Sequence, residues 1–127
     1  MILVDTDVLV WYMRGNARAA AAIEELAGMA LSVVTYIELV QGMRSRRELA
    51  ALRATLAALD ARVLQISELV SAKAMFYVEQ HFHAHSLRLV DALIAATGVS
   101  AGCPLLTANA THYRPVSDLE VRRFRPD

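Results

Sequence analysis

The chain has 127 residues, 56% of them hydrophobic, with thirteen basic and thirteen acidic residues. This length fits one domain over residues 1–127, and the longest apolar region, residues 89–106, is interrupted by an acid, two glycines and a proline, which excludes a clean membrane span. The balanced charge removes net charge as an argument for nucleic-acid binding, although twelve of the basic residues are Arg, which suits bidentate phosphate contacts.

Strand-like and helix-like segments alternate along the chain. In the first half we expect, in order, a strand at 2–4, helices at 8–13 and 17–27, a strand at 30–34, and helices at 35–46 and 47–61. In the second half we expect a strand at 63–66, helices at 68–81 and 89–100, and strands at 104–106 and 119–124. Asn16 and Ser67 are suited to cap two of the helices. This alternation predicts an α/β fold with a parallel sheet that helices cover on both faces.

Three further features bear on the compartment and the partners. A single cysteine, Cys103, excludes an intramolecular disulfide, and no basic segment typical of a signal peptide precedes the first strand, so we expect a cytoplasmic protein. The spacing of His81, His83 and His85 favours an exposed turn over a tetrahedral zinc site. The high apolar fraction predicts an interface, formed by self-association or with a tight partner.

Four acidic residues lie where they can reach one edge of the expected sheet. Asp5 and Asp7 directly follow the first strand, Glu38 follows the second, and Asp91 lies in the first turn of a very apolar helix. The carboxyl ends of parallel strands meet at one edge, which is where sites form in such sheets. Crowded, buried carboxylates have raised pKa values unless a cation is present, and oxygen-only ligands suit Mg²⁺ or Mn²⁺.

Each of these acids also has a purely structural interpretation. Either Asp5 or Asp7 could cap the following helix, which leaves the other one unexplained. Thr35 and Glu38 have the spacing of a capping box at the start of a helix. Asp91 is favoured by the helix dipole alone. The residues by themselves leave these alternatives open.

Taken in order, four motifs resemble the PIN domain family, and more narrowly the VapC-type toxin ribonucleases of bacterial toxin–antitoxin pairs. They are a strand that ends in Asp-Thr, a Ser-x-x-Thr-x-x-Glu-Leu pattern, a helix with Asp-Ala-Leu-Ile-Ala-Ala-Thr, and a late Leu-Leu-Thr-x-Asn. The matching residues are Asp5, Thr6, Ser32, Thr35, Glu38, Leu39, Leu89, residues 91–97, Leu105, Leu106, Thr107 and Asn109. The resemblance spans nearly the whole chain.

This resemblance implies a three-layer α/β/α sandwich around a mainly parallel sheet of four to five strands. It implies cleavage of RNA with Mg²⁺ or Mn²⁺ held by Asp5, Glu38 and Asp91, which match the family's acidic triad. It also implies a cognate antitoxin protein as partner, and a homodimer or a larger complex with that antitoxin. Many members carry a fourth acid where this chain has His112, while Asn109 keeps the amide position. This difference from the family pattern affects the ligands of a second metal ion.

Other side chains are expected to support this site. Thr6 and Thr107, together with Asn109 and His112, are candidates for orienting carboxylates or water. The candidates for contacts with the RNA backbone are Arg14, Arg44, Arg46, Arg47 and Arg88. Backbone contacts of this kind carry no information on base sequence, so the RNA itself is not specified.

Two alternative functions compete with a nuclease. The segment "ILVDTDVLV" also matches the first motif of haloacid-dehalogenase-type phosphatases, with Asp5 as nucleophile and Asp7 as acid/base. That interpretation leaves Glu38 and Asp91 without a role, and it places the only lysine, Lys73, on a mid-chain helix. The second alternative is a non-catalytic PIN-like binding module in which the acids only cap helices.

Overall fold

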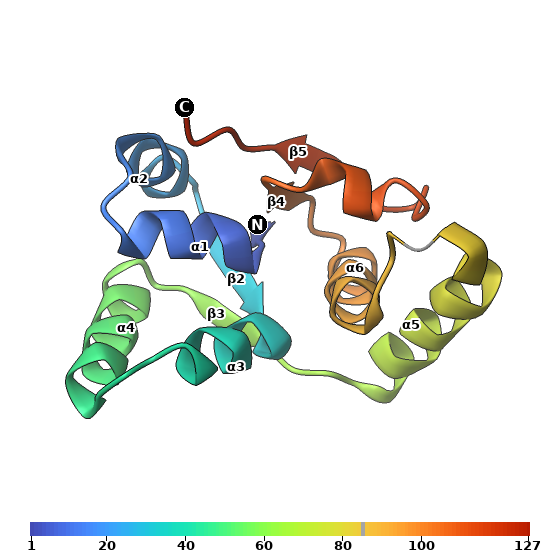
Figure 1. Ribbon diagram of the computed structural model, residues 1–127, viewed down its shortest axis with the longest axis horizontal. Helices are drawn as coiled ribbons and strands as arrows, with labels where there is room; N and C mark the ends of the chain where they lie inside the picture. The colour runs from blue at the N-terminus through green and yellow to red at the C-terminus, as the bar shows by residue number, and fades with distance from the viewer. Residues whose placement is uncertain (85) are drawn as a thin grey trace.

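The structure is a computed structural model that describes residues 1–84 and 86–127. Within these residues, five parallel strands form one sheet in the order β3-β2-β1-β4-β5 (Figure 1). The strands are β1 (Ile2–Val4), β2 (Met29–Ser32), β3 (Arg62–Leu64), β4 (Leu105–Thr107) and β5 (Val121–Arg123). Because β1 is the central strand, the residues that follow it border the ends of both β2 and β4.

Helices cover both faces of this sheet. They are α1 (Thr6–Met13), α2 (Ala17–Glu24), α3 (Val33–Gln41), α4 (Arg46–Ala58), α5 (Glu68–Gln80) and α6 (Leu89–Ala101), with two short 3₁₀ turns, η1 (Phe82–Ala84) and η2 (Ala110–Tyr113). Figure 1 shows α1, α2 and α4 on one side of the sheet, and α5 and α6 on the other. The expected three-layer α/β/α sandwich is confirmed. No helix in the described ranges is long and apolar enough to cross a membrane.

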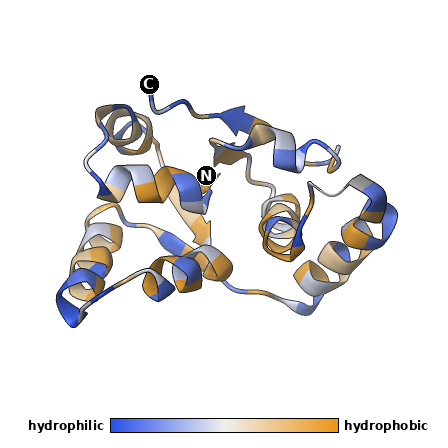
Figure 2. Cartoon of the chain, in the orientation of Figure 1, coloured by the Kyte–Doolittle hydropathy of each residue, from blue (hydrophilic) through white to orange (hydrophobic). Residues whose placement is uncertain are grey.

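Alternating strand residues supply two separate cores. Leu3 and Leu105 are fully buried in the core formed with α5 and α6, whereas Val4 and Leu106 belong to the core formed with α1, α2 and α4. Successive side chains of a strand point to opposite faces, so strands that are covered on both sides are apolar throughout. Figure 2 shows the central strands and most of α6 as hydrophobic, whereas β5 and the start of α4 are hydrophilic.

The second strand and the third helix differ from the sequence prediction. The strand expected at 30–34 ends at Ser32, because the Ser32 hydroxyl accepts a hydrogen bond from Val34 N (3.0 Å) and caps α3. The predicted capping box is wrong, since Thr35 is buried inside the helix and Glu38 lies beyond the first turn. The β-branched run favoured a strand, and the cap with its tertiary packing overrides that propensity.

The other helix starts are also set by polar caps. Asn16 and Ser67 cap α2 and α5 as predicted, each accepting a hydrogen bond from a backbone amide of the following turn. Helix α1 begins two residues earlier than expected, because Asp5 accepts a hydrogen bond from Thr6 N (2.8 Å). Of the three alternating histidines, His85 lies outside the described residues.

Candidate active site

Asp5 follows the central strand and is almost fully buried, with 6% of its surface exposed. Its Oδ1 accepts a hydrogen bond from Thr6 N (2.8 Å), and its Oδ2 accepts hydrogen bonds from Thr107 Oγ1 (2.7 Å) and Tyr113 Oη (2.9 Å). Burial raises the pKa of Asp5 to about 6, and the charge of Asp7 adds to the shift while the hydrogen bonds oppose it. A charged Asp5 is therefore costly in this position.

Asp7 lies in the first turn of α1 and faces the segment that leaves β4. Its Oδ2 accepts hydrogen bonds from Asn109 Nδ2 (2.8 Å), from Ala108 N (3.2 Å) and, at 3.4 Å, from Thr107 Oγ1. Burial raises the pKa of Asp7, and the backbone hydrogen bond from Ala108 opposes the shift. The sequence leaves the role of Asp7 open, and in the structure Asp7 binds the segment after β4 through Ala108 N and the Asn109 side chain.

Glu38 lies on α3 and is half-buried. Thr6 Oγ1 donates a hydrogen bond to Glu38 Oε1 (2.7 Å) and lies 3.0 Å from Thr35 Oγ1. The backbone N–H of Thr6 also donates to Asp5, so one residue connects Glu38 with the acid at the end of β1. The structure thus brings two of the three expected triad members to either side of Thr6.

Asp91 lies in the first turn of α6, as predicted, and its side chain is 17% exposed. Its Oδ2 accepts a hydrogen bond from Arg88 N (3.2 Å) and lies 3.9 Å from His112 Nδ1. His112 stands on η2 directly before Tyr113, so this turn presents one side chain to Asp91 and the next to Asp5.

Tyr113 lies among the acids, and the sequence did not point to it. Its side chain is 1% exposed, and its hydroxyl donates to Asp5. Burial raises the pKa of Tyr113, and the charges of Asp5, Asp91 and Asp7 raise it further, so three carboxylates lie within electrostatic reach of one hydroxyl. The only sequence signal is the chemistry of tyrosine, which needs a hydrogen-bond partner when it is buried.

The Thr107 hydroxyl links Asp5 with Asp7, and Thr6 links Asp5 with Glu38 through its backbone N–H and its hydroxyl. Within residues 1–84 and 86–127, no three His, Cys, Asp or Glu side chains are arranged so that they could hold a metal ion together. The donor chemistry nevertheless suits a hard cation, because the available groups are carboxylates and the raised pKa of Asp5 reflects buried negative charge that a cation would offset. The metal ligands expected from the sequence stay a prediction.

A pocket of about 690 Å³ adjoins this site and is lined by α1, α3 and the start of α4. Thr6 and Glu38 stand at its border, and Arg14 and Arg44 contribute to its wall. Arg44 also contacts Glu48, with 3.5 Å between Nε and Oε1. The other arginines expected to contact RNA, all exposed, are Arg46 and Arg47 at the start of α4 and Arg88 before α6.

Comparison with known proteins identifies the family. Residues 2–116 match the PIN domain family. The chain is 34% identical over 119 residues to ribonuclease VapC10 of Mycobacterium tuberculosis H37Rv, covering 89% of this chain and 86% of that protein. It is 33% identical over 126 residues to ribonuclease VapC19 of the same strain, covering 94% of this chain and 98% of that protein.

A chain of a toxin–antitoxin complex from Klebsiella pneumoniae has the same fold, with a TM-score of 0.81 and 23% identity over 100% of this chain and 98% of that one. The present chain belongs to the PIN domain family.

Proposed function

We propose that residues 1–127 form a single metal-dependent endoribonuclease domain, the toxin of a toxin–antitoxin pair. The observation that carries this proposal is the buried Asp5, to which Thr107 and Tyr113 donate hydrogen bonds and which Thr6 connects to Glu38. Support comes from the two Mycobacterium tuberculosis relatives, both of which are named ribonucleases. Membership of the PIN domain family leaves the phosphatase alternative without support.

We further propose that Asp5 and Asp91 bind Mg²⁺ or Mn²⁺, with Glu38 reaching the ion through a water molecule, because the described side chains do not form a group of three that could hold an ion directly. All three donors are carboxylates, the ligands that these cations prefer. A carboxylate has about four acceptor sites, and three hydrogen bonds reach Asp5, so acceptor capacity remains for a cation. When bound, such an ion supplies polarisation of the phosphodiester and activation of a water molecule.

The neighbouring side chains hold these carboxylates in place. Thr107 and Tyr113 both donate to Oδ2 of Asp5, which restricts rotation of the carboxylate. Thr6 holds Glu38 in the same way. Asn109 donates a hydrogen bond to Asp7, and His112 lies beside Asp91. Both side chains can therefore position water or a neighbouring carboxylate.

The substrate and the protein partner follow from the same proposal. Arg14 and Arg44 in the adjoining pocket, with the exposed Arg46 and Arg47 at the start of α4 and Arg88 before α6, would bind the RNA backbone. A cognate antitoxin is proposed as partner, in line with the toxin–antitoxin complex from Klebsiella pneumoniae that contains the same fold. The place of action is then the cytoplasm, where RNA and the antitoxin are both available.

Substitution of Asp5 is the most direct test of this function. Asp5→Asn should lower the rate of RNA cleavage by about a hundredfold or more, because a ligand of the metal is lost. EDTA should abolish cleavage by the parent chain. Sequencing the RNA ends that form when the chain is induced in cells, with and without the substitution, identifies the cleaved RNA.

Two further variants make the outcome specific. Asp7→Asn should retain cleavage, because its side-chain oxygen still accepts the hydrogen bond from Ala108 N. Glu25→Gln, an exposed change at the end of α2, controls for loss of any carboxylate. Cleavage that survives EDTA, or that survives substitution of both Asp5 and Asp91, contradicts a metal-dependent nuclease.

A further inference from the structure

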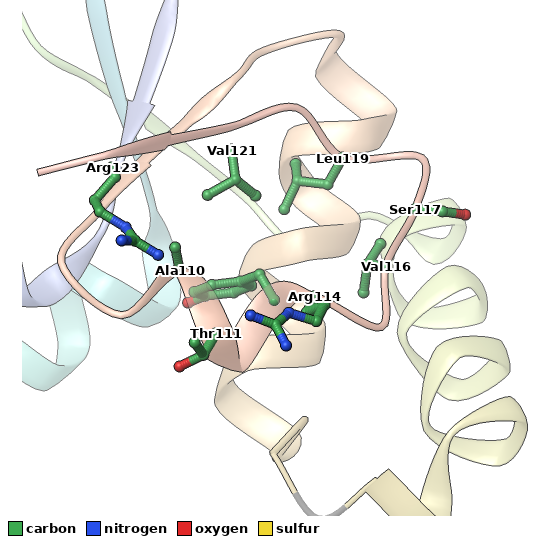
Figure 3. A pocket seen from close by; sticks show the side chains of 9 residues that line it. Ala110, Thr111, Arg114, Val116, Ser117, Leu119, Val121 and Arg123 are labelled. Carbon is green, nitrogen blue, oxygen red and sulfur yellow. The ribbon is translucent and has the colours of Figure 1, made fainter.

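A second cavity, of about 370 Å³, lies beside η2 and is bordered by Tyr113 (Figure 3). Two guanidinium groups reach it from different elements, Arg114 directly after η2 and Arg123 from β5. Neither forms an ion pair within the described part of the chain, and the described lining contains no Asp or Glu. Two arginines at one concave surface whose described lining holds no acid predict an anionic ligand.

The floor of this cavity is part of the hydrophobic core. Val116 and Leu119 are buried, and Val121 packs against them from the start of β5. Because residues alternate along a strand, Val121 and Arg123 point to the same face of β5. The backbone of β5 therefore holds Arg123 at a defined position beside this floor, while its side chain is exposed.

Both arginines are fixed next to the groups that bind Asp5. Arg123 is the register partner of Thr107 across the β4-β5 pairing, and Arg114 directly follows Tyr113. Thr107 and Tyr113 are the two side chains that donate hydrogen bonds to Asp5. The cavity thus lies at the same edge of the sheet as the acids, one strand away from Asp5.

We propose that Arg114 and Arg123 together bind a backbone phosphate of the RNA substrate, close to the phosphodiester held at the acids. This inference rests on the proposed ribonuclease function. The planar fork of Arg donates two parallel hydrogen bonds to phosphate oxygens, and two forks from different walls fix one phosphate in position and orientation. Neither arginine is among those that the sequence suggested for RNA contacts.

The interaction can be measured without catalysis. A fluorescein-labelled single-stranded RNA is titrated by fluorescence anisotropy in EDTA over a series of NaCl concentrations. The double variant Arg114→Ala/Arg123→Ala should weaken binding by roughly three- to tenfold. It should also reduce the slope of log K against log[NaCl] by about 0.7, the value for one phosphate of a single strand.

Control variants distinguish the effect of the positive charge on RNA binding from an effect on the fold. Arg122→Ala removes an arginine from the same strand but the opposite face, where its Nε lies 3.0 Å from Glu120 Oε2, and it should leave affinity and slope unchanged. Replacing both cavity arginines by Lys keeps the charge and should restore the slope. In a cleavage assay, the double alanine variant should raise KM and leave kcat unchanged.

Three results would overturn the proposal. They are an unchanged salt slope in the double alanine variant, a salt slope that the double lysine variant does not restore, and binding of inorganic phosphate that depends on both arginines while RNA affinity does not. The last result would identify a site for free phosphate. Failure of the ribonuclease proposal is read separately, from cleavage by Asp5→Asn, because RNA affinity in EDTA requires no chemistry.

Discussion

Asp5 and Asp7 are two residues apart but have different surroundings. Asp5 is deeply buried and receives its side-chain hydrogen bonds from hydroxyls of Thr107 and Tyr113, which can rotate when a ligand arrives. Asp7 is held by Asn109 and by a backbone amide, which are fixed donors. The surroundings therefore favour Asp5 for chemistry and Asp7 for holding the β4 exit in place.

The raised pKa of Asp5 predicts a pH-dependent effect on stability. The folded pKa of about 6 exceeds the unfolded value, so the folded state binds more protons between about pH 4 and 6, and stability falls as pH rises through that window. Asp5→Asn removes this penalty. In EDTA, the free energy of unfolding of the variant relative to the parent should be about 2 kcal/mol higher at pH 8 than at pH 4, which means that the variant is relatively more stable at pH 8.

Urea unfolding at the two pH values measures this difference. Comparing the variant with the parent at both pH values isolates the part of the stability change that depends on the charge of Asp5, which includes the hydrogen bonds that oppose its raised pKa. Asp127→Asn, at the exposed end of the chain, should give no such pH-dependent difference. An equal effect of Asp5→Asn at both pH values would show that its buried charge costs nothing.

At the level of elements, the sequence predicted the order of strands and helices and the edge of the sheet where the acids lie. Asp5 and Asp91 could be placed because each directly follows a strand or starts a helix, which are local signals. The start of α3 could not, because β-branched residues at 33 and 34 favour a strand and only the buried Ser32 cap decides. Tyr113 was missed because its partner Asp5 lies 108 residues away in the sequence.

The Ser32 cap should contribute measurably to the stability of α3. Ser32 is fully buried, so Ser32→Ala leaves the amide of Val34 without a partner or water, and we expect a loss of about 1–2 kcal/mol. Ser45 caps α4 in an exposed position, where water can replace the hydroxyl, so Ser45→Ala should cost about 0.5 kcal/mol. Urea midpoints of the two variants measure the ratio.

The consequence of this cap extends to the site, because α3 also carries Glu38. Fraying of its first turn would loosen Thr35, which lies beside the Thr6 hydroxyl that holds Glu38. Ser32→Ala should therefore reduce RNA cleavage at temperatures where the chain is still folded, and Ser45→Ala should not. Equal stability losses in the two variants would mean that burial does not strengthen the cap.

On the scale of the whole molecule, the helix layer of α5 and α6 leaves more large apolar side chains exposed than the layer of α1, α2 and α4. Figure 1 shows α5 at the margin of the fold, where it packs on α6. Its outer surface and the following turn leave large apolar side chains exposed, with Leu69 and Phe76 at 57%, Met75 at 63% and Phe82 at 64%. Exposed apolar surface of this kind marks a site of protein–protein interaction.

We expect a second copy of the chain to cover this α5 surface, in keeping with the interface that the hydrophobic composition predicts and the homodimer that the family resemblance implies. Light scattering of the purified chain at micromolar concentration should give the mass of a dimer. Phe76→Glu places a charge in the contact and should shift the mass to that of a monomer, with an unchanged circular dichroism spectrum, because the side chain is already exposed. Arg53→Glu, an exposed change on α4 across the sheet, should leave the dimer intact. A monomeric parent chain, or a dimer that tolerates Phe76→Glu, would assign this surface to a different partner.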